Sequence, residues 1–213
     1  MAQITVVVPY WAGEAEMPVT FLRLNWDPVS EEIRKKCARL YCQIWKEPPW
    51  NESFWEEAGV LADMQRELEK PCAEGFIAVY LRALYRYEYE NCRTVSDETL
   101  MMVAGFTWGY PVSQEELREI AGNNALDPLF CEHSRVFYVD ELGVNSEHRG
   151  RGIGKRLSHL LLKAAKTHGI KLAVLRTDDQ AVAARRLYSS LGFSELTARD
   201  ERYPERTYWV LAL

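Results

Sequence analysis

The sequence predicts an α/β (α+β) fold, and three observations support this class. Short stretches with strand patterning alternate with longer stretches of helical spacing in the order β-α-α-β-β-β-α-β-α-β-β. A chain of 213 residues with 47% hydrophobic residues can bury one large core, so residues 1–213 are expected to form one domain. The sequence contains no internal repeat or low-complexity segment that would suggest another architecture.

The N-terminal part predicts one strand followed by two helices. Residues 1–19 are expected to form an N-terminal extension or an extra edge strand, and residues 20–25 the first strand of the fold. Asp27-Pro28 then marks a helix start, because proline suits the first turn. The prolines within residues 47–52 end this helix, and a second helix is predicted over residues 53–70.

The middle of the chain predicts an antiparallel pair of strands over residues 75–85 and 99–112. The polar stretch 86–98 between them is longer than a tight hairpin needs, so we expect a protruding loop or a lengthened hairpin tip. Ser113 and Glu116 then have the spacing of a capping box, which predicts the start of a short helix.

The C-terminal part predicts a regular alternation of strands and helices. A strand over residues 136–144 precedes a helix with apolar residues at helical spacing from Ile153 onward. The remaining predicted elements are a strand at 171–177, a helix beginning near 180, and strands near 195–200 and 207–213.

A glycine-rich turn between the strand ending at Val144 and the next helix predicts an anion site. Backbone N–H groups converge at a helix N-terminus, glycines allow a ligand to approach closely, and the helix dipole favours negative charge. A Walker loop does not fit, because position 149 is arginine and Arg156 follows Lys155 where serine or threonine is required. The dinucleotide fingerprint fails as well, since it would need glycine at position 155.

The spacing that does fit is Arg-x-x-Gly-x-Gly, formed by Arg149, Gly152 and Gly154. It resembles the acetyl-CoA pyrophosphate loop of the GNAT superfamily of N-acetyltransferases. Residues 180–193 resemble the second signature of that family, a helix ending in Leu-Tyr-x-x-x-Gly-Phe with Tyr188 as its tyrosine. Both motifs occur in the family's order, so the chain is identified as a member of this superfamily.

The resemblance implies a GNAT fold, with a central mixed, mostly antiparallel sheet of about seven strands flanked by helices on both faces. It also implies acetyl-CoA as cosubstrate, with residues 136–193 as the acetyl-CoA-binding core and the signature strand pairing with the pantetheine arm. The histidines and cysteines show no ligand spacing, so no metal is expected. The expected cofactor-binding residues are Leu142, Gly143, Val144, Arg149, Gly150, Arg151, Gly152, Ile153, Gly154 and Gln180, of which Gln180 stands where many family members have asparagine.

Acetyl transfer to an amine requires an acceptor for the ammonium proton and a donor for the leaving thiolate. The resemblance places Tyr188 beside the thioester sulfur, where its hydroxyl would protonate the thiolate; the alternative is a tyrosine that only packs in the core. Asp140 and Glu141 are the candidate bases, with Glu141 first because strand alternation puts it on the face of Gly143, opposite Asp140. The alternative is that a carboxylate solvates the strand end or pairs with a core arginine.

Two acidic segments are relevant to the identity of the amine acceptor. If residues 47–69 and 113–132 flank the cleft, they favour a small cationic amine such as an aminoglycoside or polyamine; otherwise they are solvated helix faces. Inserts at 86–98 and 113–133 that cover the groove would favour a small molecule over a peptide. A peptide or protein amine as acceptor and a non-catalytic acyl-CoA sensor remain the alternatives.

Composition excludes several other classes of function. A net charge of −5 without a basic stripe argues against nucleic-acid binding. Five cysteines without a Cys-x-x-Cys pair indicate reduced thiols. The N-terminus has no basic leader, and no apolar stretch is long enough to span a bilayer. We therefore expect a cytoplasmic enzyme without membrane partners, and the sequence leaves a homodimer open.

Overall fold

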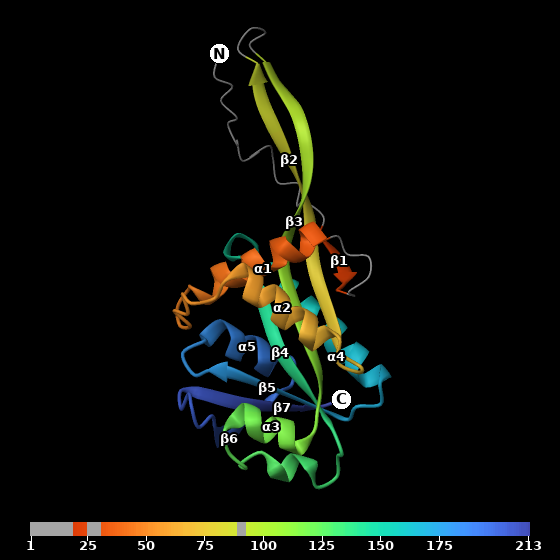
Figure 1. The fold of residues 1–213 in the computed structure, drawn as a ribbon, viewed down its shortest axis with the longest axis vertical. Coiled ribbons are helices and arrows are strands. Elements are labelled where there is room, and N and C mark those ends of the chain that lie inside the picture. The colour runs from red at the N-terminus through yellow and green to blue at the C-terminus, as the bar shows by residue number, and fades with distance from the viewer. Residues whose placement is uncertain (1–18, 25–30, 89–92) are drawn as a thin grey trace.

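The computed structural model describes residues 19–24, 31–88 and 93–213, which form a mixed sheet with helices on both faces (Figure 1). The strands are β1 (Thr20–Arg23), β2 (Glu74–Glu88), β3 (Arg93–Val112), β4 (Val136–Val144), β5 (Leu172–Asp178), β6 (Ser194–Arg199) and β7 (Arg206–Ala212). The helices are α1 (Glu31–Trp45), α2 (Glu57–Leu68), α3 (Gln114–Ala121), α4 (Ile153–Thr167) and α5 (Val182–Ser190), with short 3-10 turns η2 (Asp127–Phe130) and η3 (Ser146–His148). The predicted α/β class is confirmed. The predictions for residues 1–18 and for a helix start at 27–28 lie outside the described residues.

The seven strands follow the order β1-β2-β3-β4-β5-β7-β6. Every neighbouring pair is antiparallel except β4 and β5, which run parallel, so the prediction of a mixed, mostly antiparallel sheet is confirmed. The parallel ladder is short: only Phe137–Val139 of β4 pairs with Ala173–Leu175 of β5. Beyond Val139 the two central strands are no longer paired, and the sheet opens there.

A β-bulge in β4 coincides with this opening. Trp108 of β3 pairs with Glu141, but the next residue, Gly109, pairs with Val139, so Asp140 is an extra residue in β4. A bulge bends its strand and increases the local twist. Glycine is required at position 109, because an added Cβ would lie 2.4 Å from the carbonyl oxygen of Tyr138.

The helices cover the sheet in two layers. Side chains of α1 and α2, such as Tyr41 and Met64, pack against Phe106 and Trp108 of β3. On the other face, α4 and α5 pack through residues that include Leu161 against the sheet core. In the ranges that the structure describes, no helix is both long and apolar enough to span a bilayer.

The loop between α1 and α2 is longer than predicted, because α2 begins at Glu57 and not at residue 53. The Trp55 Nε1 group donates to Glu52 Oε2 at 2.6 Å, and the Glu52 backbone N–H donates to the carbonyl of Trp45. These contacts hold residues 46–56 as an ordered loop against the end of α1. We refer to residues 46–56 as the α1–α2 loop.

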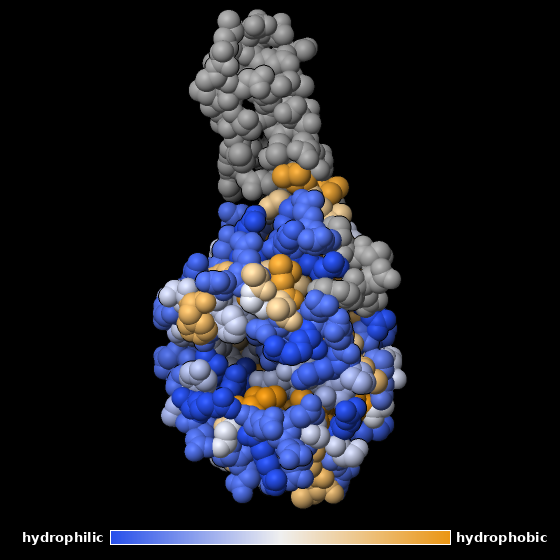
Figure 2. Space-filling model, in the orientation of Figure 1, coloured by the Kyte–Doolittle hydropathy of each residue, from blue (hydrophilic) through white to orange (hydrophobic). Residues whose placement is uncertain are grey.

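Strands β2 and β3 are also longer than predicted. Their pairing runs from Glu74 opposite Gly109 to Glu88 opposite Arg93, so most of the predicted 86–98 loop is strand. The outer part of this hairpin extends away from the body of the protein (Figure 1). At its base apolar residues reach the surface (Figure 2), among them the paired Leu81 and Met101. Of the two predicted alternatives, a protruding loop and a lengthened hairpin, the lengthened hairpin is therefore correct.

The predicted capping box is present at the start of α3. Ser113 Oγ accepts from the Glu116 backbone N–H at 3.2 Å, and the Ser113 N–H donates to Glu116 Oε2 at 2.8 Å. Gly122 ends the helix with a φ of 74°, which suits glycine. Sequence spacing alone was enough to place this helix.

Candidate active site

A cleft of about 480 Å³ lies where β4 and β5 separate. One wall is the end of β4, the other is the start of α5 with the end of β5, and the α1–α2 loop covers part of it. The structure gathers twelve of the thirteen predicted site residues around this cleft: Asp140, Glu141, Leu142, Gly143, Val144, Arg149, Gly150, Gly152, Ile153, Gly154, Gln180 and Tyr188. Arg151 does not line it.

The β4 wall offers unpaired backbone to the cleft. Leu142, Gly143 and Val144 pair with β3 on one edge, whereas β5 leaves the other edge after Val139. A strand edge of this kind presents N–H and C=O groups to an extended ligand. This is the geometry that a pantetheine arm needs in order to pair with β4.

The glycine-rich turn lies at the N-terminus of α4. Gly150 and Gly152 adopt φ values of 76° and 77°, a region that other residues enter at a cost, and no atom lies within 4 Å of an added Cβ. The first backbone N–H groups of α4 have no partner within the helix. Open space, converging N–H groups and the helix dipole together suit a phosphate group.

Arg149 has a structural role in addition to any contact with an anion. Its Nε donates to the carbonyl of Val144 at 3.0 Å, and its Nη2 forms an ion pair with Glu47 at 2.6 Å. The side chain thereby links the end of β4 to the α1–α2 loop. Gln180 lines the cleft, and its backbone N–H donates to Asp178 Oδ1 at 2.7 Å.

Tyr188 extends from α5 into the cleft lining on the α4–α5 face of the sheet. Only 8% of it is exposed, and its ring contacts those of Phe193 and Trp209. Burial, with a smaller contribution from the charge of Glu141, raises the pKa of the Tyr188 hydroxyl above its ordinary value. The hydroxyl therefore keeps its proton at neutral pH and can donate it.

The prediction that Asp140 and Glu141 lie on opposite faces is wrong. Glu141 Oε1 accepts from the Tyr41 hydroxyl at 2.9 Å, and Asp140 Oδ2 accepts from the Tyr110 hydroxyl at 3.1 Å. Asp140 also interacts with Glu67 of α2, so both carboxyls belong to the α1–α2 face. The bulge at Asp140 interrupts the alternation on which the prediction relied.

Glu67 is a site residue that the sequence analysis missed. Its Oε2 accepts from Trp108 Nε1 at 2.8 Å, which turns the carboxyl toward the sheet. Burial, and then the charge of Asp140, raise the pKa of Glu67 to about 8. A signal was present, because Glu67 follows the core residue Met64 by three positions and thus faces the sheet.

The pKa of Glu141 is also raised well above its ordinary value. Burial is the main cause, and the charges of Asp140 and Glu67 add to it, whereas the hydrogen bond from Tyr41 acts in the opposite direction. A carboxyl with a raised pKa is a stronger proton acceptor when it is ionised. Glu141 therefore has the environment expected of a general base.

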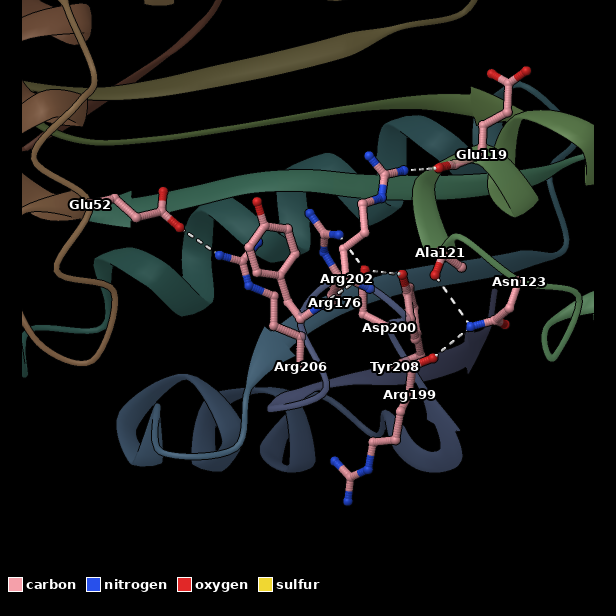
Figure 3. Close-up of polar contacts among 11 residues, drawn as sticks. Glu52, Glu119, Ala121, Asn123, Arg176, Arg199, Asp200, Arg202, Arg206 and Tyr208 are labelled. Carbon is pink, nitrogen blue, oxygen red and sulfur yellow. Dashed lines mark hydrogen bonds and ion pairs between the residues drawn. The ribbon is translucent and has the colours of Figure 1, made fainter.

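Arg176 of β5 is a second missed residue, and it lines the cleft opposite β4. Its Nη1 donates to Asp200 Oδ2 at 2.5 Å, and the Tyr208 hydroxyl donates to the same oxygen at 3.0 Å (Figure 3). These contacts hold the guanidinium in place. Burial works against its charge, but Tyr138, Tyr208 and Asp200 together keep its pKa above the ordinary value.

The α1–α2 loop is held over the cleft from two sides. Glu47 pairs with Arg149, and Glu52 Oε1 pairs with Arg206 Nη2 at 2.5 Å (Figure 3). The Arg206 guanidinium lies 5.7 Å from the ring centroid of Trp50. The loop that carries Trp50 is therefore fixed to β7 as well as to the turn before α4.

The two predicted inserts do not cover the cleft. The 86–98 segment lies in the hairpin that extends away from the body (Figure 1). The 113–133 segment packs against the β6–β7 end, where Asn123 donates to the carbonyl of Arg199 and Arg202 donates to the carbonyl of Glu119 (Figure 3). Cover comes instead from Glu47, Pro48, Pro49 and Trp50 of the α1–α2 loop.

Ion pairs neutralise much of the first acidic segment, and the second does not line the cleft. In the first segment Glu47 pairs with Arg149, Glu52 with Arg206, Glu57 with Arg39 and Asp63 with Arg66. No residue of 113–132 is among those that line the cleft in the described part of the chain. The negative charge near the cleft thus comes from buried carboxyls and not from an acidic rim.

A family model of the acetyltransferase (GNAT) family matches residues 49–193, more than half of the chain. This chain belongs to the acetyltransferase (GNAT) family. The family consists of acyltransferases, and several solved members hold CoA or acetyl-CoA. The predicted family, enzyme class and acetyl-CoA cosubstrate are therefore confirmed at the level of the family.

Curated relatives match the chain over shorter stretches. N-acetylaspartate synthetase of Rattus norvegicus is 42% identical over 69 residues, which cover 32% of this chain and 23% of that protein. N-acetyltransferase 8B of Homo sapiens is 32% identical over 111 residues, which cover 52% of this chain and 42% of that protein. The chain thus spans less than half the length of these relatives.

Solved structures of similar fold include enzymes with different acceptors. The NatC complex bound to Gag peptide and CoA has a TM-score of 0.60 at 16% identity, covering 92% of this chain and 99% of that chain. Aminoglycoside N-acetyltransferase AAC(6')-Iy in complex with CoA has a TM-score of 0.54 at 16% identity, covering 86% of this chain and 93% of that chain. At this level of identity the similarity shows the fold alone.

Proposed function

We propose that this protein transfers an acetyl group from acetyl-CoA to a primary amine, with a small cationic molecule such as an aminoglycoside or polyamine as acceptor. The observation that carries the proposal is the cleft between β4 and β5. It brings together a phosphate-binding turn, an open strand edge, a protonated tyrosine and a carboxylate base. Acyl transfer from a thioester requires each of these groups.

Each wall of the cleft supplies one part of the reaction. The backbone of Gly150–Gly154 binds the pyrophosphate, and the open edge of Leu142–Val144 pairs with the pantetheine arm. A backbone N–H of that edge stabilises the oxygen that becomes negative as the amine attacks the thioester carbon. Glu141 takes the proton from the amine, and Tyr188 gives its proton to the departing CoA thiolate.

The charge around the cleft supports a cationic acceptor. Asp140 and Glu141 lie on one wall, with Glu67 behind them, and Arg176 is already engaged by Asp200 on the other. The cations Arg149 and Arg176 are paired with Glu47 and Asp200, whereas Asp140 and Glu141 lie on the β4 wall, which supports a positively charged ligand there. The fixed α1–α2 loop supports a small acceptor, because it covers part of the cleft. The four described cysteines are free thiols, which supports a reducing compartment such as the cytoplasm.

A peptide amine is the second candidate acceptor. It is favoured by the similarity to the NatC complex, whose structure holds a peptide and CoA. A peptide would have to pass the α1–α2 loop, which the pair between Glu52 and Arg206 holds against β7. The two acceptors therefore differ in their dependence on Arg206.

The test is to measure release of CoA thiol from acetyl-CoA with aminoglycosides, polyamines, amino acids and basic peptides, alongside Tyr188→Phe. Turnover with small polycations that is lost in the variant supports the proposal. Turnover with peptides alone would replace the small acceptor by a peptide. Binding of acetyl-CoA without turnover on any amine would indicate an acyl-CoA sensor and overturn the enzymatic proposal.

A further inference from the structure

The Arg149 side chain joins the end of β4 to the α1–α2 loop at the cleft. Its Nε donates to the carbonyl oxygen of Val144 at 3.0 Å, and its Nη2 lies 2.6 Å from Glu47 Oε2. Arg149 and Glu47 both line the cleft together with Gly150 and Gly152 of the glycine-rich turn. A carboxylate of the loop is therefore held by the arginine that adjoins the turn suited to a phosphate group.

The two contacts of Arg149 differ in kind. Val144 offers a backbone carbonyl at the end of a paired strand, whereas Glu47 offers a side chain that is 35% exposed to an arginine that is 46% exposed. An ion pair with this exposure contributes little net stability, because water and salt screen both charges. A guanidinium carries five N–H donors and matches phosphate as well as carboxylate. Arg149 can therefore change its anion while its Nε bond to Val144 stays in place.

The charge of Glu47 acts against an anion at the turn. The N-terminus of α4 favours negative charge, and Lys155 in its first turn also lines the cleft. A carboxylate beside the same guanidinium repels a phosphate and occupies a donor that the phosphate would use. Both effects weaken the binding of a diphosphate, and neither depends on the part of the ligand that carries the thioester.

Resting on the diphosphate site of the function proposed above, we propose that Glu47 competes with the diphosphate of acetyl-CoA for Arg149 and so sets the affinity of the protein for its cosubstrate. As acetyl-CoA binds, the guanidinium keeps its bond to Val144 and exchanges the Glu47 carboxylate for a phosphate oxygen. The displaced carboxylate turns to water, as its partial exposure allows. Because the loop residues that cover the cleft begin at Glu47, the exchange also releases this cover from the turn before α4, while the pair between Glu52 and Arg206 keeps it attached to β7.

The decisive variant is Glu47→Gln in the whole chain, with the binding of acetyl-CoA measured by isothermal titration. The amide keeps the size of the side chain and loses its charge. We expect the Kd to fall by about 2- to 5-fold at low ionic strength, the range that a half-exposed ion pair allows. The gain should shrink in about 0.5 M NaCl, where screening is stronger. Glu56→Gln removes the same charge from an exposed residue of the same loop that does not line the cleft, and should leave the Kd unchanged.

A double-mutant cycle assigns the effect to Arg149. In Arg149→Gln the added Glu47→Gln should improve binding less than in the parent protein, because the contested donor is gone. S-acetylpantetheine, which has the thioester but no diphosphate, should bind equally to the parent protein and to Glu47→Gln. Each readout is binding and not turnover, so a protein that binds acetyl-CoA but acetylates no amine still tests the inference, and only the function proposed above has failed. An unchanged or higher Kd for acetyl-CoA in Glu47→Gln, or the same gain with and without Arg149, overturns the inference.

Discussion

The hydroxyl of Tyr41 donates a 2.9 Å hydrogen bond to Glu141 Oε1 and ties α1 to the bulged strand beside the cleft. The ring of Tyr41 is buried, stacks on Trp45 at 4.3 Å between centroids, and meets Trp55 edge-on at 5.3 Å. Because this contact stabilises the carboxylate form, it opposes the effect of burial on Glu141. A helix far from β4 in the sequence therefore helps to set the charge of the candidate base.

Replacing Tyr41 by phenylalanine should raise the pKa of Glu141, since the opposing hydrogen bond is lost and burial remains. If Glu141 must be ionised to act, the acid limb of the kcat/KM profile moves to higher pH by about one unit, and activity at neutral pH falls. The measurement is the pH dependence of kcat/KM, with the exposed Tyr203→Phe as control. An unchanged acid limb would show either that Tyr41 does not influence the pKa of Glu141 or that Glu141 is not the general base.

Tyr188→Phe should retain acetyl-CoA affinity and lose turnover by about 10²–10⁴-fold, because the ring still packs while the proton donor is gone. Isothermal titration with acetyl-CoA and steady-state kinetics separate the two effects. A variant with full activity would show that the hydroxyl only packs. Weaker binding of acetyl-CoA in proportion to the lost rate would indicate a contribution to binding instead.

Two glycines should respond to alanine in opposite directions. Gly109→Ala places a Cβ 2.4 Å from the Tyr138 carbonyl oxygen, and relieving this contact requires the bulged ladder to shift, at a cost of about 1–3 kcal/mol or more. Gly59→Ala lies in α2 with no atom within 4 Å of the new Cβ, and should stabilise by about 0.5–1 kcal/mol. The free energy of unfolding of both variants, measured in urea, tests this prediction. Equal effects of the two substitutions would contradict the close contact between Gly109 and the bulged strand.

The ion pair between Glu52 and Arg206 should contribute to stability because both side chains are largely buried, with 13% and 14% exposed. Arg206→Met leaves Glu52 without its cationic partner, although Trp55 still donates to it, and should cost about 3 kcal/mol. The double variant with Glu52→Gln should recover part of this loss. A double-mutant cycle by urea unfolding measures the coupling, and a value near zero would mean that the α1–α2 loop is held by other contacts.

Glu67 should also make stability depend on pH. Its pKa is about 8 in the folded protein and 4.5 in the reference state, so the folded protein binds more protons between these values. The free energy of unfolding should therefore fall as pH rises from 4.5 to about 8, by at most about 1.4 kcal/mol per unit. In Glu67→Gln this slope should become shallower by the Glu67 contribution, while Asp140 and Glu141, whose pKa values are also raised, keep the remainder, and urea unfolding across the range measures the difference. The same slope in both proteins would assign it to other groups.

Much of the candidate site was predictable because its residues are close in sequence. Arg149, Gly152 and Gly154 form a local motif, and a strand–turn–helix unit fixes their arrangement without help from distant parts of the chain. Tyr188 was found in the same way, from a second local motif. The structure places these residues around one cleft, as their order in the chain suggested.

The sequence by itself determined the order of strands and helices, the α3 capping box and the glycine-rich turn before α4, since each depends on contacts between near neighbours in the chain. Only the tertiary structure decided which face Asp140 takes, because a single-residue bulge changes strand alternation and leaves little trace in composition. It also decided that Glu67 reaches Asp140 and that Arg206 holds the α1–α2 loop. Such pairs join residues 73 or more positions apart in the sequence. The chain contains many carboxylates, and the packing of the helices on the sheet decides which of them meets a given partner.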